Sequence, residues 1–291
     1  MIEYVRVDSN KFAIYHAIYA DSNIFASFDW NEKVSYSKPN GDEYFVYRDK
    51  TIIGGFAQKD NMLSHPFVVP PFCDRNEYWQ CVLQHALETS RTNEINLTEI
   101  PEVDTQALTQ SFGAVSKWSK HIMLRPTEQF DSMLRENFYF SCLVEKDIPE
   151  IVEVIFQAHS TGYTSTKWEP DTAKIKEAVE RRFCLFGESN TLFMGNMVKC
   201  KTNEEIAGVC IAGVYPDSPN NFATIHQLSV KSEYRRKGIA KAMIQKSIND
   251  ANSISPVITL GVLLGNPAEI LYRETGFVPG PSYSELAYTR K

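Results

Sequence analysis

The sequence predicts the α/β fold class, built as two similar units within one chain. Two-residue alternation of apolar side chains, which is typical of strands, repeatedly gives way to helical spacing. The same order of strands and helices occurs twice, with a near-constant separation between corresponding elements. The length of 291 residues is enough for two ordinary domains.

The first half is predicted to begin with a helix over residues 11–26, followed by a polar, aromatic connection through Trp30 and Tyr36. The strand-like runs 43–48 and 51–57 are separated by two residues and predict a hairpin. The later elements of this half are a strand at 66–69, a helix with Trp79, Val82, Leu83 and Leu87 on one face, a strand at 94–98, a helix at 105–111 ended by Gly113, and a strand at 121–125.

The second half is predicted to begin with a helix that Asp147 caps. Residues 224–230 alternate as a strand, and strict alternation puts His226 on the same face as Leu228 and Val230. The other elements are strands at 191–198, 206–214 and 257–262, and helices at 171–183, from 239 onward, and at 266–274 with a stop at Gly276.

The repeat is supported by matching positions in the two halves. The segment 228–230 lies 161 positions after 67–69, and Gly276 lies 163 positions after Gly113. The polar stretch 126–137 separates the halves, which predicts one domain over residues 1–130 and a second over residues 131–291.

A short basic loop stands between the strand at 224–230 and the helix that follows it. The first turn of a helix has unpaired N–H groups and the positive end of the dipole, so it attracts anions. Gly238 lets a ligand approach the backbone, and Arg235, Arg236 and Lys237 add positive charge. The alternative is a surface loop with solvated cations and a capping glycine.

The first half lacks this loop chemistry. At the positions that match Arg235 and Gly238 it has Asp74 and Glu77, and Trp79 matches Ala240. A carboxylate and an indole at a helix N-terminus oppose the binding of a phosphate. We therefore expect the first half to have lost the anion site and the second half to carry the chemistry.

Composition limits the function classes. The hydrophobic share of 43% and the charged share of 23% are ordinary for a globular protein. The net charge of −6 argues against a nucleic-acid partner and fits a cationic substrate. The chain has no membrane-length apolar run and no N-terminal secretion signal, and its six cysteines are scattered. We expect reduced thiols, no metal, no membrane partner and a cytoplasmic location.

The loop and a second stretch together resemble the GNAT acetyltransferase superfamily. The segment 235–240, RRKGIA, is similar to the family's Q/R-x-x-G-x-G/A loop, and 266–277, NPAEILYRETGF, is similar to its N-x-x-A-x-x-L-Y-x-x-x-G-F signature. The resemblance is specific over residues 224–278. It implies two GNAT-like domains, each with a mixed, mostly antiparallel sheet. Residues 1–130 would be a degenerate, structural or substrate-shaping copy, and residues 131–291 would bind acetyl-CoA.

The resemblance also implies the residues that contact the cofactor. Backbone N–H groups of the loop would hold the pyrophosphate, main-chain atoms of Leu228 and Val230 would pair with the pantetheine arm, and the Val230 N–H would face the thioester carbonyl. Asn266 would bond the cofactor arm or cap a helix, or do both. The implied set is Leu228, Ser229, Val230, Arg235, Arg236, Lys237, Gly238, Ile239, Ala240, Lys241 and Asn266.

Tyr272 matches the family tyrosine that protonates the leaving thiolate, which is the catalytic role that the resemblance implies. The alternative is a packed helix tyrosine. His226 is the candidate general base, against the alternatives of a structural histidine, a water chain or carboxylates such as Glu145 and Asp217.

The predicted reaction moves an acetyl group from acetyl-CoA to a primary amine by direct attack, through a tetrahedral intermediate. The amine is a small molecule or a peptide, with His159, Tyr163, Trp168 and Tyr215 as candidate pocket residues. The alternatives are a non-catalytic acyl-CoA-binding or sensory protein and an aminoacyl-tRNA-dependent transferase, for which a broad basic surface is expected. The first half has a further possible role in a homodimer.

Overall fold

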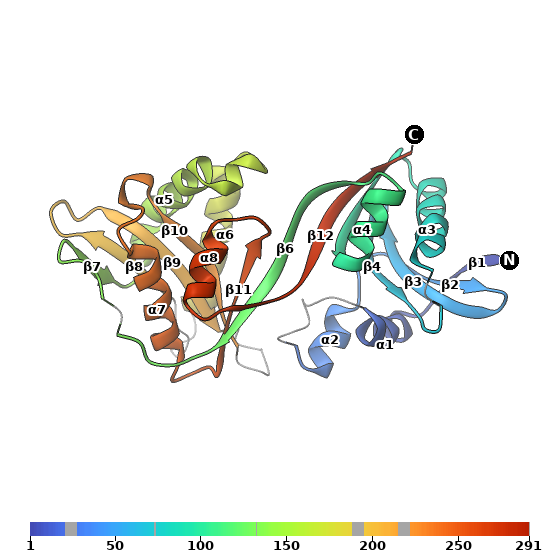
Figure 1. Cartoon of the computed structure of the whole chain (residues 1–291), viewed down its shortest axis with the longest axis horizontal. Coiled ribbons are helices and arrows are strands. Elements are labelled where there is room, and N and C mark those ends of the chain that lie inside the picture. The colour runs from blue at the N-terminus through green and yellow to red at the C-terminus, as the bar shows by residue number, and fades with distance from the viewer. Residues whose placement is uncertain (21–27, 73, 132, 188–194, 215–221, 291) are drawn as a thin grey trace. The chain divides into compact units, whose positions relative to one another are not determined.

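The computed structural model describes all residues except 21–27, 73, 132, 188–194, 215–221 and 291 (Figure 1). The chain divides into two compact units. Unit 1 contains Met1–His121 and Gly280–Lys291, and unit 2 contains Ile122–Pro279. The C-terminal segment therefore belongs to the first unit, whereas the sequence predicted two consecutive domains. The roles predicted for the two domains stay predictions.

Unit 1 is a mixed sheet with helices on both faces. Its strands follow the order β1-β2-β3-β4-β5-β12, antiparallel except for the parallel pair β4–β5. The strands are β1 (Ile2–Arg6), β2 (Asp42–Arg48), β3 (Thr51–Lys59), β4 (Met62–Val68), β5 (Glu94–Pro101) and the unit 1 part of β12 (Val278–Thr289). The helices are α1 (Ser9–Tyr19), α2 (Trp30–Tyr36), α3 (Arg75–Thr89) and α4 (Glu102–Ser111).

Unit 2 has the same plan. Its strands follow the order β7-β8-β9-β10-β11-β6, and β10–β11 is the parallel pair. The strands are β7 (Phe138–Ser141), β8 (Gly195–Cys200), β9 (Ile206–Val214), β10 (Ala223–Val230), β11 (Val257–Leu263) and the unit 2 part of β6 (Val115–Pro126). The helices are α5 (Ile148–Thr161), α6 (Thr172–Gly187), α7 (Ile239–Ala251) and α8 (Ala268–Glu274).

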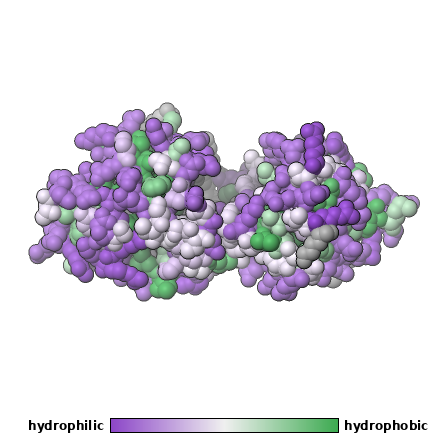
Figure 2. All heavy atoms as spheres, turned by 90° about the horizontal axis from the view of Figure 1, so that it is seen from above, coloured by the Kyte–Doolittle hydropathy of each residue, from purple (hydrophilic) through white to green (hydrophobic). Residues whose placement is uncertain are grey.

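The two faces of the unit 2 sheet have separate cores (Figure 1). Helices α7 and α8 cover one face, where Met243 and Tyr272 pack with Cys210. Helices α5 and α6 cover the other, where Ile155 and Val179 pack with Ile211 and its neighbours. From Val209 to Ala212, successive residues of β9 enter the two cores in turn, and the whole strand is buried because both of its faces are covered. The visible surface in Figure 2 is mostly hydrophilic, with hydrophobic residues in small scattered groups.

Most predicted elements are confirmed, including the hairpin of β2 and β3 and the strand β9. Several details of the prediction are wrong. The first helix ends at Tyr19, and residues 30–36 form helix α2, which Asp29 and Glu32 start with a reciprocal capping box. Asp147 stands at the N-cap of α5 but makes no capping hydrogen bond. The strands β1, β7 and β12 were not predicted.

No helix among the described residues is long and apolar enough to cross a membrane. In the same part of the chain, no cluster of three or more His, Cys, Asp or Glu side chains is arranged to hold a metal ion.

Candidate active site

The parallel strands β10 and β11 separate part-way along their length. They pair only over Ala223–Ile225 and Ile258–Leu260, whereas β10 keeps its antiparallel partners on β9 as far as Val230. Beyond Ile225, the edge of β10 that faces β11 is therefore outside the ladder. Unpaired strand groups of this kind can bind an extended chain by hydrogen bonds.

A β-bulge marks the point of separation. The register of β10 against β9 shifts between Ile225 and Gln227, so His226 is the inserted residue. Strict alternation put Ile225 opposite to Leu228 and Val230, but all three contact the core on the α7 side. The prediction that His226 shares a face with Leu228 and Val230 is wrong, because the bulge changes the phase of the strand at this residue.

The basic loop after β10 leads directly into the N-terminus of α7. Gly238 is the N-cap residue, with a φ of +83°, and no side chain among the described residues caps the helix. The first-turn N–H groups of Ile239, Ala240 and Lys241 consequently have no intrahelical partner. A Cβ added to Gly238 would meet no atom of the described residues within 4 Å, so these residues leave the backbone accessible to a ligand. This is the geometry of an anion site at the end of a 13-residue helix.

Glu205 binds two side chains at the start of this loop. This carboxylate forms an ion pair with the buried Lys231 and accepts a hydrogen bond from the Tyr234 hydroxyl at 2.9 Å. The ammonium of Lys237 lies over the Tyr234 ring, 4.9 Å from its centroid. The pKa of Glu205 is lowered by its bonds with Lys231 and Tyr234. Several of the loop's polar groups thus fix its shape, and Arg236 remains exposed.

Arg235 uses its donors inside the protein. Its N–H donates to the Ser232 carbonyl, and its guanidinium donates to carbonyls at the ends of β10 and α5.

Asn266 also forms a hydrogen bond within the protein, because its Oδ1 accepts from the Ala268 N–H at 3.0 Å. This bond satisfies the first N–H of α8, although the N-cap residue of that helix is Pro267 and not Asn266.

Tyr272 lies on α8 in the α7-side core and is 9% exposed. Burial raises the pKa of its phenol, and the nearby Cys210 raises it further. Its ring packs edge-on against Phe277. Within the described part of the chain its hydroxyl forms no hydrogen bond. The phenol therefore stays protonated at neutral pH, with a proton to donate.

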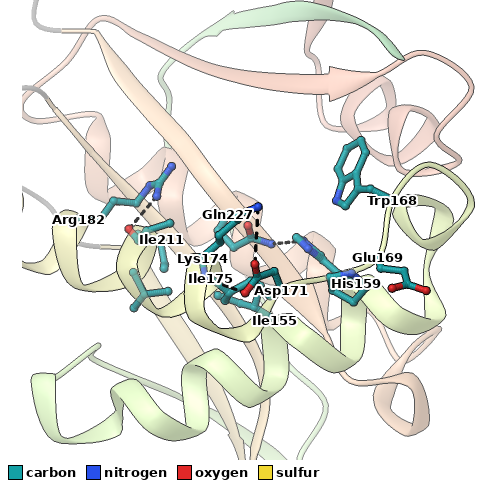
Figure 3. Close-up of a pocket in the computed structure, with 13 residues that line it drawn as sticks. Ile155, His159, Trp168, Glu169, Asp171, Lys174, Ile175, Arg182, Ile211 and Gln227 are labelled. Carbon is teal, nitrogen blue, oxygen red and sulfur yellow. Dashed lines mark hydrogen bonds and ion pairs between the residues drawn. The ribbon is translucent and has the colours of Figure 1, made fainter. Parts of the chain in front are cut away.

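A cavity of about 370 Å³ opens on the other face, between α5, α6 and the sheet. His159 and Gln227 approach each other across it, with 3.2 Å between His159 Nε2 and Gln227 Nε2 (Figure 3). Trp168 and Arg182 lie at opposite ends of the lining (Figure 3). Its lining combines apolar side chains with charges of both signs from Glu169, Asp171, Lys174 and Arg182.

Both histidines near this cavity are neutral at neutral pH. Burial lowers the pKa of His159. Burial and the charge of Arg182 lower the pKa of His226 to about 4. A neutral imidazole can accept a proton, but so low a pKa makes His226 a weak base.

Residues 153–277 match the model of the acetyltransferase (GNAT) family. The segment contains the strand, loop and helix described above, together with α8 and Tyr272. These residues form a GNAT domain.

Solved structures extend the likeness to the whole chain. A GCN5-related N-acetyltransferase from Sphaerobacter thermophilus matches 99% of this chain and 95% of its own, with a TM-score of 0.66 and 13% identity. A tandem GNAT protein from the clavulanic acid biosynthesis pathway matches 99% and 98%, with a TM-score of 0.58 and 10% identity. A GNAT-family acetyltransferase from Colwellia psychrerythraea matches over the full length of both chains, with a TM-score of 0.57 and 12% identity. No curated protein has a matching sequence. The chain has the tandem GNAT fold.

The GNAT fold of unit 1 lacks the open helix end. Asp74 is the N-cap of α3, and its carboxylate accepts the Glu77 N–H at 2.9 Å. Arg75, the one cation retained in this loop, pairs with Asp104 at 2.8 Å. A carboxylate therefore already occupies the donor positions at this helix end, and the loss of the anion site from this half stays a prediction.

The bulge and its histidine recur in unit 1. His65 lies 161 positions before His226, in β4, where the register against β3 also shifts. Here the Tyr36 carbonyl lies 3.2 Å from His65 Nε2, and the Tyr36 hydroxyl donates to Glu99 of β5. Side chains of unit 1 thus bridge the strands β4 and β5 beyond their paired residues.

Of the predicted pocket residues, His159 and Trp168 line the cavity. Tyr163 does not, because its hydroxyl donates to the Leu264 carbonyl at 2.8 Å. Tyr215 and Asp217 lie outside the described residues. Gln227 and Arg182 were missed. Gln227 was recognisable only as a polar residue within the strand, and Arg182 had no sequence signal beyond its place on an amphipathic helix.

Proposed function

We propose that this GNAT domain is an N-acetyltransferase that moves an acetyl group from acetyl-CoA to a primary amine. One observation carries the proposal. An open, uncapped helix N-terminus adjoins a strand edge that has left its ladder, so that one extended, phosphorylated ligand would contact both.

The residues present fit acetyl-CoA. The N–H groups of Gly238, Ile239 and Ala240 would bind the pyrophosphate, with Arg236 and Lys241 as exposed cations beside it. The edge of β10 from Leu228 to Val230 would pair with the pantetheine arm. Backbone groups supply most of these contacts, which explains why the loop needs a fixed shape.

The predicted chemistry is direct attack. The amine nitrogen bonds to the thioester carbonyl carbon, and the Val230 N–H stabilises the oxyanion of the tetrahedral intermediate. The C–S bond then breaks, and Tyr272 gives its proton to the departing thiolate. The burial that raises the pKa of the Tyr272 phenol raises that of a thiol in the same site, so their basicities stay comparable.

The acceptor amine would enter through the cavity beneath α5 and α6. Its ammonium must lose a proton before it attacks, and His226 is the proposed acceptor of that proton. With a pKa of about 4, His226 would serve mainly to relay the proton to solvent rather than to hold it. The mixed charges of the lining would accommodate a small molecule or a peptide terminus.

Two measurements test the proposal. Calorimetry with acetyl-CoA checks binding, and an amine panel with free-thiol detection checks turnover. We expect one acetyl-CoA per chain and amine-dependent release of CoA. Binding without turnover on any amine would favour the non-catalytic acyl-CoA-binding alternative. Failure to bind acetyl-CoA at all would leave the aminoacyl-tRNA-dependent transferase as the alternative to test.

A further inference from the structure

The guanidinium of Arg235 connects three parts of unit 2. Its Nε donates to the Val230 carbonyl at 3.1 Å, at the end of β10. Its Nη1 donates to the Thr161 carbonyl at 3.2 Å. Its Nη2 donates to the Ala158 carbonyl at 3.3 Å and to Thr161 Oγ1 at 2.9 Å. One side chain from the anion-site loop therefore holds both the end of β10 and the last turn of α5.

The chemistry of these contacts suits arginine. The last carbonyls of a helix have no intrahelical partner and carry the negative end of the dipole. A planar guanidinium can reach Ala158 and Thr161 while its Nε bonds a third carbonyl, at Val230. The compact ammonium of a lysine cannot reproduce this fork.

The helix end that Arg235 holds is also a wall of the cavity. His159 lies between Ala158 and Thr161 in the same turn of α5. It lines the cavity and contacts Gln227 of β10. The anion-site loop and the cavity thus share one helical turn, and Arg235 links the loop to it directly.

We propose that Arg235 is a positioning residue that couples the cofactor loop to the acceptor cavity. Acetyl-CoA bound at the α7 N-terminus orders the last turn of α5 through Arg235, and the ordered turn fixes His159 for the amine. This inference rests on the proposed function. Because coupling is reciprocal, acetyl-CoA and the amine each raise the other's affinity.

Amide hydrogen exchange on the full chain, with and without acetyl-CoA, tests the coupling. In the native protein we expect acetyl-CoA to slow exchange in residues 231–241 and in 156–162. In Arg235→Lys, which keeps the charge but loses the fork, the loop stays protected and the slowing in 156–162 falls about tenfold. Thr161→Val removes one of the Arg235 hydrogen bonds, together with the bond that the Thr161 hydroxyl donates to the Gln157 carbonyl, and gives a smaller loss. Arg181→Lys, at an exposed arginine of α6, is the matched control and behaves as native.

Three results would overturn the coupling while the proposed function stands. One is an amide exchange rate in residues 156–162 of the native protein that acetyl-CoA does not change. Another is an Arg235→Lys response equal to the native one. The third is loss of acetyl-CoA binding itself in Arg235→Lys with unchanged thermal unfolding, which would make Arg235 a cofactor ligand. Failure of the native protein to bind acetyl-CoA would instead remove the proposed function, and the coupling with it.

Discussion

The phenol of Tyr272 is protonated, buried and without a hydrogen-bond partner in the described part of the chain. Replacement by phenylalanine removes only the hydroxyl, so we expect the fold and acetyl-CoA affinity of Tyr272→Phe to be unchanged. Because a positioned acid contributes about 10²-fold or more, kcat should fall by about that factor. Steady-state kinetics and calorimetry measure the two effects. Equal turnover by Tyr272→Phe and the native enzyme would leave the tyrosine a packing role.

The lowered pKa of a second single residue, His226, predicts that the stability of the protein depends on pH. Its folded-state pKa of about 4 lies below the ordinary value of 6.5. The unfolded chain therefore binds more protons between these values, and stability is lost as the pH falls from about 6.5 towards 4. This one group contributes up to about 3 kcal/mol to that loss.

Urea unfolding at pH 7.5 and pH 5 checks this expectation. The native protein should lose more unfolding free energy between the two pH values than His226→Asn does, because the variant lacks the titrating group. Other buried histidines, such as His16 and His65, keep their own contribution in both proteins. An equal loss in the two proteins would show that the pKa of His226 is not lowered by folding.

At the scale of elements, the α7 N-terminus can be tested through two glycines with similar backbones. Gly238 has a φ of +83° and Gly276 a φ of +86°, so alanine at either position should cost about 1–2 kcal/mol. Only Gly238 borders the predicted anion site, where an added Cβ meets no atom of the described residues within 4 Å. At Gly276 the added Cβ instead meets Arg125 Nη1 at 3.0 Å.

We therefore expect Gly238→Ala to weaken acetyl-CoA binding about tenfold or more by calorimetry, by obstructing backbone contacts to the pyrophosphate. Gly276→Ala should lose at least as much stability, because its added Cβ also crowds Arg125, and should keep its affinity. If both variants bind acetyl-CoA as the native protein does, the pyrophosphate does not lie at this helix end.

For the whole molecule, the C-terminal strand stabilises the N-terminal unit. β12 pairs with β5 along Glu94–Pro101, and Leu286 is fully buried in the core that contains Val82 and Leu97. Leu286→Ala should cost about 2–5 kcal/mol and lower the unfolding temperature of unit 1. The exposed Val115 provides the control, with an expected change within about 0.5 kcal/mol for Val115→Ala.

Differential scanning calorimetry with and without acetyl-CoA separates the two units. Since the proposed site lies in unit 2, acetyl-CoA should still bind Leu286→Ala with native affinity and should raise only the unit 2 transition. A transition of unit 2 that falls with that of unit 1 would mean that the C-terminal strand supports both units.

The amino-acid sequence by itself determined the tandem α/β organisation, the position of the open loop and the half that carries it. These features depend on residues close together in the chain. The loop at 235–240 and the signature at 266–277 each lie within a dozen residues. In unit 1, the single residue Asp74 already indicates that the end of the helix is capped. Such motifs can be recognised in the sequence because a turn or a helix end is formed by residues that are neighbours in the chain.

Only the tertiary structure decided how distant residues meet. The bulge at His226 depends on its pairing with β9, so alternation within β10 alone put the histidine on the wrong face. The contact between His159 and Gln227 joins residues 68 positions apart, and that between Arg235 and Thr161 joins residues 74 apart. β12, near the C-terminus, pairs with β5 of the N-terminal half. Strand pairing and packing are set by the whole fold, and no local pattern encodes the partner.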